Sequence, residues 1–238
     1  MSGVSDLTGA LRVRQRSATR RRIRRIVEIF GVLFLVAGLV WFIVFSPVFV
    51  VRHVRVEGNR LVTAARVIEA AEVPMGRQLA RVDTAAIAER VQVLPVVQQA
   101  EVSRGWPNAV RVRITERQRV YQRQEAAGFS WVDADGVIFH TQHERVPAVV
   151  VGQTPEADPR LLRDVATVVA AMPAELAQRV QAVVASSVDL IVLQLDNDQQ
   201  VIWGSAAQSD LKGQVVVPLL KQQGRVFDVS APSHPTLR

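Results

Sequence analysis

A long apolar segment near the start of the chain limits what this protein can be. Residues 29–45 are seventeen consecutive apolar or glycine residues, and Ile26 and Val27 extend the run on the other side of Glu28. A helix rises ~1.5 Å per residue, so about 20 residues span a hydrocarbon core about 30 Å thick. Because backbone polar groups in lipid must bond to one another, a helix is expected here. The sequence therefore predicts a transmembrane helix over residues 26–46.

This apolar segment has two alternative interpretations. A buried helix of this length in a soluble protein would normally show a polar stripe, and this run has none. A cleaved signal peptide would have a shorter run and a small-residue cleavage site, whereas this one leads into Phe45-Ser46-Pro47-Val48-Phe49. An uncleaved signal anchor explains the segment best.

The charge of the chain predicts its orientation in the membrane. Residues 1–25 hold eight arginines and one acid, Asp6, while the other 213 residues hold equal numbers of basic and acidic residues. Positive residues beside a span stay in the cytoplasm, so residues 1–25 should form a cytoplasmic tail and the bulk should be extracytoplasmic. The tail lacks interleaved aromatic residues, so we expect a lipid partner and no nucleic acid.

The first part beyond the span predicts two helices and three strands. Residues 50–56 alternate as in a strand, and residues 96–102 and 110–115 predict two more. Thr63 can cap one helix, and Asp83 or Thr84 the next. The expected order over residues 48–117 is strand, helix, helix, strand, strand.

The remaining chain predicts a β-rich region over residues 118–229. Asp158 and Pro159 suit a helix start, and Ser209 and Gly224 suggest a helix over residues 209–223. Val226 to Val229 predicts a last strand. The residues after it, 230–238, include two prolines and are expected to form a flexible tail.

No motif in the chain predicts catalysis or a bound cofactor. The absence of cysteine excludes disulfides, thiol catalysis and Cys-ligated metals. No nucleophile elbow, phosphate-binding glycine loop or dinucleotide fingerprint is present. We therefore expect no enzyme activity, no catalytic residue and no cofactor.

Two weak metal-like patterns have simpler explanations. His140 and His143, next to Glu144, are spaced so that a strand would place the two imidazoles on opposite faces, which favours a solvated loop. Asp133 begins a stretch that resembles a calcium loop ending at Glu144, but its glycine, Gly136, is fourth and not sixth. An Asp-Gly turn is the better interpretation, so no metal site is predicted.

Several short stretches, in order, resemble the FtsQ/DivIB family of bacterial cell-division proteins. In the first part they are residues 54–59, 94–97, 104–108 and 112–117, which resemble the opening strand and closing hairpin of a POTRA domain. In the second part they are residues 131–139, 147–152 and 227–232, which are similar to the family's next domain. One departure is Arg119, which stands where the family usually has proline.

This resemblance implies an α+β protein with a single N-terminal transmembrane helix, an extracytoplasmic POTRA domain over residues 48–117 and a β-rich domain over residues 118–229. It also implies a bitopic scaffold of the divisome in the plasma membrane, enriched at the septum, that links early and late division proteins. Expected partners are FtsB- and FtsL-like coiled-coil proteins and other divisome membrane proteins.

An exposed strand edge can accept a strand from a partner, and the family binds partners largely through its last strands. The expected partner-binding residues are therefore Val226, Phe227, Asp228 and Val229. A last strand paired on both sides is the alternative. The other functional hypotheses are a membrane-anchored envelope enzyme and a POTRA-type export chaperone.

Overall fold

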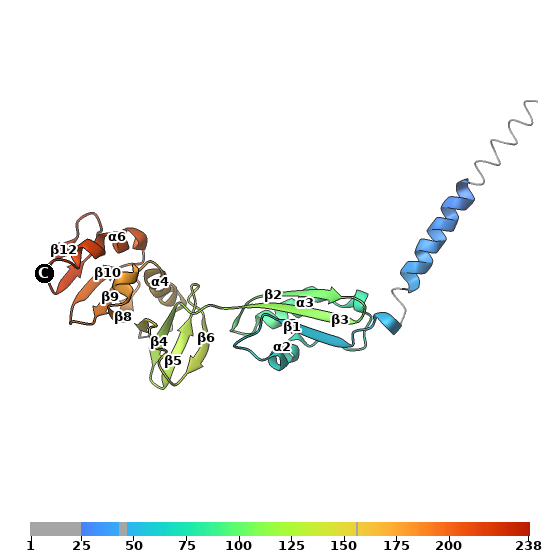
Figure 1. Cartoon of the computed structure of the whole chain (residues 1–238), viewed down its shortest axis with the longest axis horizontal. Helices are drawn as coiled ribbons and strands as arrows, with labels where there is room; N and C mark the ends of the chain where they lie inside the picture. The colour runs from blue at the N-terminus through green and yellow to red at the C-terminus, as the bar shows by residue number, and fades with distance from the viewer. Residues whose placement is uncertain (1–24, 43–46, 156) are drawn as a thin grey trace, which may run out of the picture. The chain divides into compact units, whose positions relative to one another are not determined.

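The computed structural model describes residues 25–42, 47–155 and 157–238 (Figure 1). Arg25–Phe42 is an 18-residue helix of mean hydropathy 2.1 whose residues are all exposed. The predicted apolar helix is thus confirmed over these residues. The rest of the expected arginine-rich tail, residues 1–24, and the expected end of the span, residues 43–46, lie outside the described residues.

Residues 47–117, here called the small-sheet region, carry the predicted strand, helix, helix, strand, strand order. Its elements are η1 (Pro47–Phe49), β1 (His53–Glu57), α2 (Ala64–Ala71), η2 (Leu79–Arg81), α3 (Thr84–Gln92), β2 (Val97–Gly105) and β3 (Ala109–Glu116). The three strands form one sheet in the order β1-β3-β2, so the last strand lies between the other two (Figure 1).

Local sequence explains where these elements begin and which side they bury. The Thr63 hydroxyl accepts a hydrogen bond from the Arg66 N–H and caps α2, as predicted. The Asp83 carboxylate accepts one from the Ala85 N–H at the start of α3. Alternate residues of β3 are buried, and so is one face of each helix. The buried apolar residues of these three elements are Val67, Ala71, Ile87, Val91, Ala109, Val110, Val112 and Ile114.

Residues 118–238, here called the large-sheet region, build a nine-stranded sheet with three helices. Its elements are β4 (Tyr121–Glu125), β5 (Gly128–Val132), β6 (Ile138–Gln142), β7 (Val151–Gln153), α4 (Pro159–Ala170), α5 (Ala174–Ala177), β8 (Val180–Ser187), β9 (Leu190–Leu195), β10 (Gln200–Gly204), α6 (Ser209–Leu219), β11 (Val226–Asp228) and β12 (Thr236–Leu237). The strand order is β12-β11-β10-β9-β8-β7-β4-β5-β6.

The core of the large-sheet region lies between one face of the sheet and its helices. Asp158 caps α4 by accepting a hydrogen bond from the Arg160 N–H, as the sequence predicted. Leu162 and Val165 of α4 are buried in one apolar cluster with alternate residues of β9. Ile191 and Leu193 are those alternate residues, which shows that the helices cover this face of the sheet.

The predicted Asp-Gly turn between β5 and β6 is confirmed. Gly136 adopts a φ of 79°, and its N–H donates to the Asp133 carbonyl. A Cβ on Gly136 would lie 2.6 Å from the backbone nitrogen of Arg163 in α4. Glycine is therefore required both by the turn and by the close approach of the helix.

The C-terminal end of the sheet differs from the sequence expectation in two ways. The strand at residues 226–229 is not an edge, because β11 pairs in parallel with β10 and antiparallel with β12. The expected flexible tail, residues 230–238, contains β12, and Arg238 exchanges backbone hydrogen bonds with Val226. The two prolines left this pairing possible because neither lies at a position that must donate to β11.

Candidate partner-binding surface

The four residues expected to bind a partner divide between the core and the surface. Phe227 and Val229 are fully buried, whereas Val226 and Asp228 are partly exposed. Alternation along a strand explains the division, because Phe227 points to the helix-covered face and its two neighbours point to the other. Only Val226 and Asp228 can contact a partner through their side chains without unfolding of the sheet.

Backbone groups at the sheet edge offer a second kind of contact. The sheet ends at β12 on one side and at β6 on the other. Val226 and Arg238 form a hydrogen-bonded pair, and Phe227 is opposite Leu237. In an antiparallel ladder the N–H and C=O of the next residue point the other way, so those of Leu237 face the open edge. The outermost strand is short, which limits uncontrolled pairing with other chains.

The sheet face without helices carries a lateral row of residues from five neighbouring strands. The pairing register places Asp228 opposite Ile202, Ile202 opposite Val192, Val192 opposite Val184, and Val184 opposite Gln153. Ile202, Val192 and Val184 are all partly exposed. We call these five residues the cross-strand row. It forms an apolar strip with polar ends, and the alternating pattern of β9 and β10 is the only sequence signal for it.

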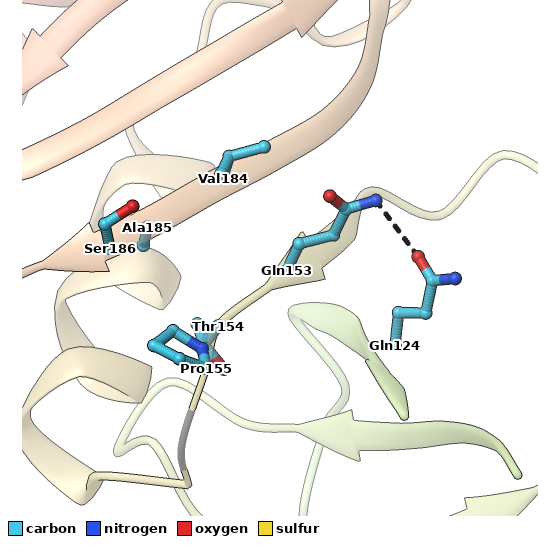
Figure 2. Close-up of a pocket in the computed structure, with 7 residues that line it drawn as sticks. All are labelled: Gln124, Gln153, Thr154, Pro155, Val184, Ala185 and Ser186. Atoms are coloured by element: carbon cyan, nitrogen blue, oxygen red, sulfur yellow. Dashed lines mark hydrogen bonds between the residues drawn. The ribbon is translucent and has the colours of Figure 1, made fainter. Parts of the chain in front are cut away.

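A shallow pocket lies at the Gln153 end of the cross-strand row (Figure 2). The Gln153 side-chain amide donates to the Gln124 Oε1 at 3.0 Å. The residues lining it are Gln124, Gln153, Thr154, Pro155, Val184, Ala185 and Ser186. None of them carries a side chain that titrates near neutral pH, so the pocket has amide and hydroxyl groups for binding but no group for acid–base catalysis.

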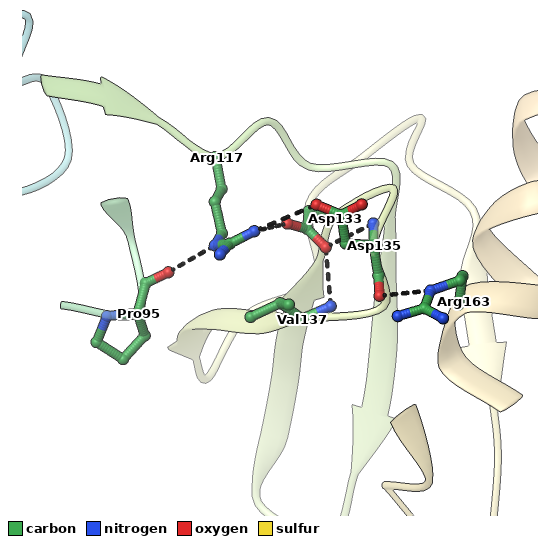
Figure 3. Close-up of polar contacts among 6 residues, drawn as sticks. All are labelled: Pro95, Arg117, Asp133, Asp135, Val137 and Arg163. Atoms are coloured by element: carbon green, nitrogen blue, oxygen red, sulfur yellow. Dashed lines mark hydrogen bonds and ion pairs between the residues drawn. The ribbon is translucent and has the colours of Figure 1, made fainter. Parts of the chain in front are cut away.

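The carboxylate of Asp133 is used for structure. It accepts hydrogen bonds from the backbone N–H groups of Asp135 and Val137 and forms an ion pair with Arg117 (Figure 3). Arg117 also donates to the Pro95 carbonyl at 3.1 Å. Because these donors occupy Asp133, the calcium-loop interpretation of this stretch has no support in its geometry.

Arg119, the departure from the family pattern, has a clear contact. Its guanidinium lies 4.1 Å from the centroid of the Trp131 ring, a cation–π arrangement. Trp131 also contacts the ring of His140, at a centroid distance of 4.5 Å. His143 instead faces the Ala127 carbonyl through its Nδ1. The two histidines therefore have separate partners, and the described residues contain no cluster of three potential metal ligands.

Lys212 is the one lysine side chain buried in the described part of the chain. Its ammonium donates to the Trp203 and Ser205 carbonyls, each at 2.9 Å. Burial lowers the pKa of Lys212, and the charge of Asp228 opposes this change. These contacts hold the chain where β10 leads into α6, so the ammonium is not itself available to a ligand.

Comparison with known proteins matches both regions. Residues 49–117 match the family model described as "POTRA domain, FtsQ-type", and residues 120–231 match "Cell division protein FtsQ/DivIB, C-terminal". A cell division protein FtsQ of Streptomyces venezuelae is 35% identical over 98% of this chain and 90% of its own length. Those of Streptomyces coelicolor (33%; 90% and 88%) and Mycobacteroides abscessus (34%; 86% and 66%) are also similar.

Proposed function

Because the chain belongs to the FtsQ/DivIB family of bacterial cell-division proteins, we propose that it is a bitopic membrane scaffold of the divisome. Its arginine-rich tail lies in the cytoplasm, and both sheet regions lie outside the membrane. It joins early and late division proteins at the septum and so controls septal wall synthesis. The relatives are cell-division proteins, which supports a role in binding rather than catalysis.

One observation carries this proposal. The two family models match one after the other, following a predominantly apolar helix of 18 residues that is exposed along its whole length. A single anchor confines the folded regions to the membrane plane. Confinement raises the effective concentration of partners that are anchored in the same membrane, so weak contacts suffice for assembly.

The partners that fit best are the extracytoplasmic segments of FtsB- and FtsL-like coiled-coil proteins. We place their contact on the cross-strand row and on the β12 edge beside it. One partner segment would bond as a strand to the outward backbone groups of Leu237, and a separate apolar stretch of the partner would cover Ile202 and Val192. Val226 and Asp228 would line the same surface, while Phe227 and Val229 would support it from the core.

The test is co-purification of these partners with the full chain from native membranes. Ile202→Arg places a charge in the cross-strand row and should reduce partner recovery at least about tenfold, as loss of a central interface contact does. Leu211→Arg is the matched control, because Leu211 is 45% exposed on α6, which packs against the other face. Equal recovery with both variants would show that the row is not the interface.

Depletion of the protein tests the scaffold role itself. Cells that lose a divisome scaffold should grow as undivided filaments or branched cells. Normal division with altered wall composition would instead support an envelope enzyme and would rule out the proposed role.

A further inference from the structure

We propose that the end of the small-sheet region nearest the apolar helix is a lipid-binding surface, which rests against the outer face of the membrane. The inference depends on the membrane anchor of the proposed function and goes beyond it. The surface gathers three segments: η1 with the residues up to His53, the turn at residues 73–78, and the turn at residues 105–108. We call it the aromatic–arginine surface.

Backbone hydrogen bonds bring the three segments together. The Val51 carbonyl accepts from the Gly76 N–H at 2.8 Å, and the Val51 N–H donates to the Arg77 carbonyl at 2.9 Å. On its other side the same stretch bonds to the third segment, where the Arg52 N–H donates to the Asn108 carbonyl at 2.8 Å. Residues that are distant in sequence therefore share one end of this region.

Each segment exposes a large apolar side chain at this end. Val48 is 53% exposed, Met75 57% and Trp106 51%. The ring of Phe49 meets that of Trp106 edge to face, with centroids 5.5 Å apart. Water penalises such grouped apolar exposure, and an indole ring favours the headgroup layer of a membrane, where its face is in an apolar setting and its N–H is hydrated.

The charge of these segments, counted together with the residues that adjoin them, suits anionic lipids. Residues 47–56, 73–82 and 102–112 contain six arginines and no acidic residue. Arg52 and Arg77 lie in the segments themselves, and Arg55, Arg81 and Arg111 lie within three residues of them. The sixth, Arg104, donates to the Leu79 and Val82 carbonyls and holds the end of the region together. Basic residues close to an anionic membrane surface add to binding, and their long side chains can reach phosphate groups while apolar neighbours insert.

The covalent chain keeps this surface near the membrane. Pro47 follows the last described residue of the helix, Phe42, by five positions, so their Cα atoms can be at most about 18 Å apart. A membrane-spanning helix therefore delivers the first of the three segments directly to the headgroup layer. No other protein is needed to explain why the apolar groups are exposed here.

The test uses site-specific fluorescence, which the cysteine-free chain allows without background labelling. The full chain, with Met75→Cys carrying a bimane label, is reconstituted into vesicles that contain a lipid with a nitroxide headgroup. Leu190→Cys, 49% exposed in β9, is the control on the large-sheet region, and Val36→Cys in the apolar helix reports insertion in parallel vesicles whose nitroxide is on the lipid acyl chain. The label at position 75 should be quenched at least about twofold more than that at position 190, because only the former enters the headgroup layer.

Lipid charge and further substitutions sharpen the result. Replacing part of the phosphatidylcholine with phosphatidylglycerol should increase quenching at position 75, and high salt should remove the increase. Trp106→Ser should lower quenching in both lipids. The double substitution Arg52→Gln and Arg77→Gln should abolish only the effect of phosphatidylglycerol.

The outcomes separate this inference from the proposed function. Quenching at position 36 but no more at position 75 than at position 190 would overturn the lipid-binding surface alone. Quenching at neither 36 nor 75 would remove the anchor and this inference with it. Quenching at position 75 together with failure of the partner experiment would leave the inference standing and refute the proposed interface.

Discussion

The two sheet regions differ in how far their order depends on a single apolar core. In the large-sheet region, a continuous apolar cluster joins helices to one face of a nine-stranded sheet. In the small-sheet region, charged side chains bond to backbone groups of loops. Arg90 donates to the Ala71 carbonyl, and Arg104 donates to the Leu79 carbonyl at 3.1 Å. A small domain buries too little apolar surface to fix every loop, so polar contacts contribute a larger share of its order.

Glu116 is the clearest of these contacts. Its carboxylate accepts hydrogen bonds from the N–H groups of Arg60, Leu61 and Val62, at 2.8 to 3.0 Å. Partial burial alone would raise the pKa of Glu116, but these three backbone bonds and the charge of Arg60 together outweigh it and lower the pKa. The comparison therefore predicts that pH affects the small-sheet region through a specific group.

The largest expected effect concerns the apolar core of the large-sheet region. Phe227→Ala should reduce the free energy of unfolding of the large-sheet region by about 3–5 kcal/mol, because it leaves a cavity at a fully buried position. Hydrogen-exchange mass spectrometry of the full chain in detergent would measure this region by region. Protection should fall in β9 to β12 and stay unchanged in residues 47–117. Loss of protection in both regions would contradict the idea that each is stabilised separately.

A smaller effect is expected where a polar group sits within the large-sheet region. Asp133→Ala leaves two backbone N–H groups without their acceptor and removes the nearer carboxylate from Arg117, and it should cost about 2–3 kcal/mol. Thermal unfolding followed by circular dichroism would measure the loss. Asp135→Ala is the control, because that carboxylate is exposed and lies 3.5 Å from Arg117. If both variants unfold at the same temperature, the contacts of the Asp133 carboxylate contribute little to stability.

The smallest effect concerns Glu116. Glu116→Gln removes the charge but keeps one acceptor oxygen, so it should cost about 1 kcal/mol at pH 7. Because the pKa of Glu116 is lower in the folded state than in the unfolded state, the ionised carboxylate stabilises the fold at pH values above the unfolded-state pKa. This stabilisation is lost as the pH falls through the folded-state pKa. The difference between wild type and variant should therefore shrink when melts are repeated in acid below pH 4.5, the ordinary value.

Glu69→Gln provides the matched control for this measurement. Glu69 pairs with Arg66 on the surface of α2, and both side chains are more than 60% exposed. Such a pair contributes less than about 0.5 kcal/mol. An equal effect of the two substitutions would show that the loop contact of Glu116 has no special weight.

Short-range patterns in the sequence determined much of this protein. The apolar run predicted a helix that is present at Arg25–Phe42, and Thr63 and Asp158 predicted two helix starts. Alternation along β3 predicted its buried face. Each of these features depends on groups within a few residues of one another, so the local sequence is enough to predict it.

The position of the candidate partner-binding surface follows only from the tertiary structure. Alternation shows which side chains of a strand share a face, but not which strand lies beside it. The interior position of β11 depends on parallel pairing with β10 across the intervening helix α6, and on β12 returning from the C-terminus. The cross-strand row and the aromatic–arginine surface likewise join residues far apart in the chain. Their placement follows from long-range backbone hydrogen bonds and shared burial, which no local pattern specifies.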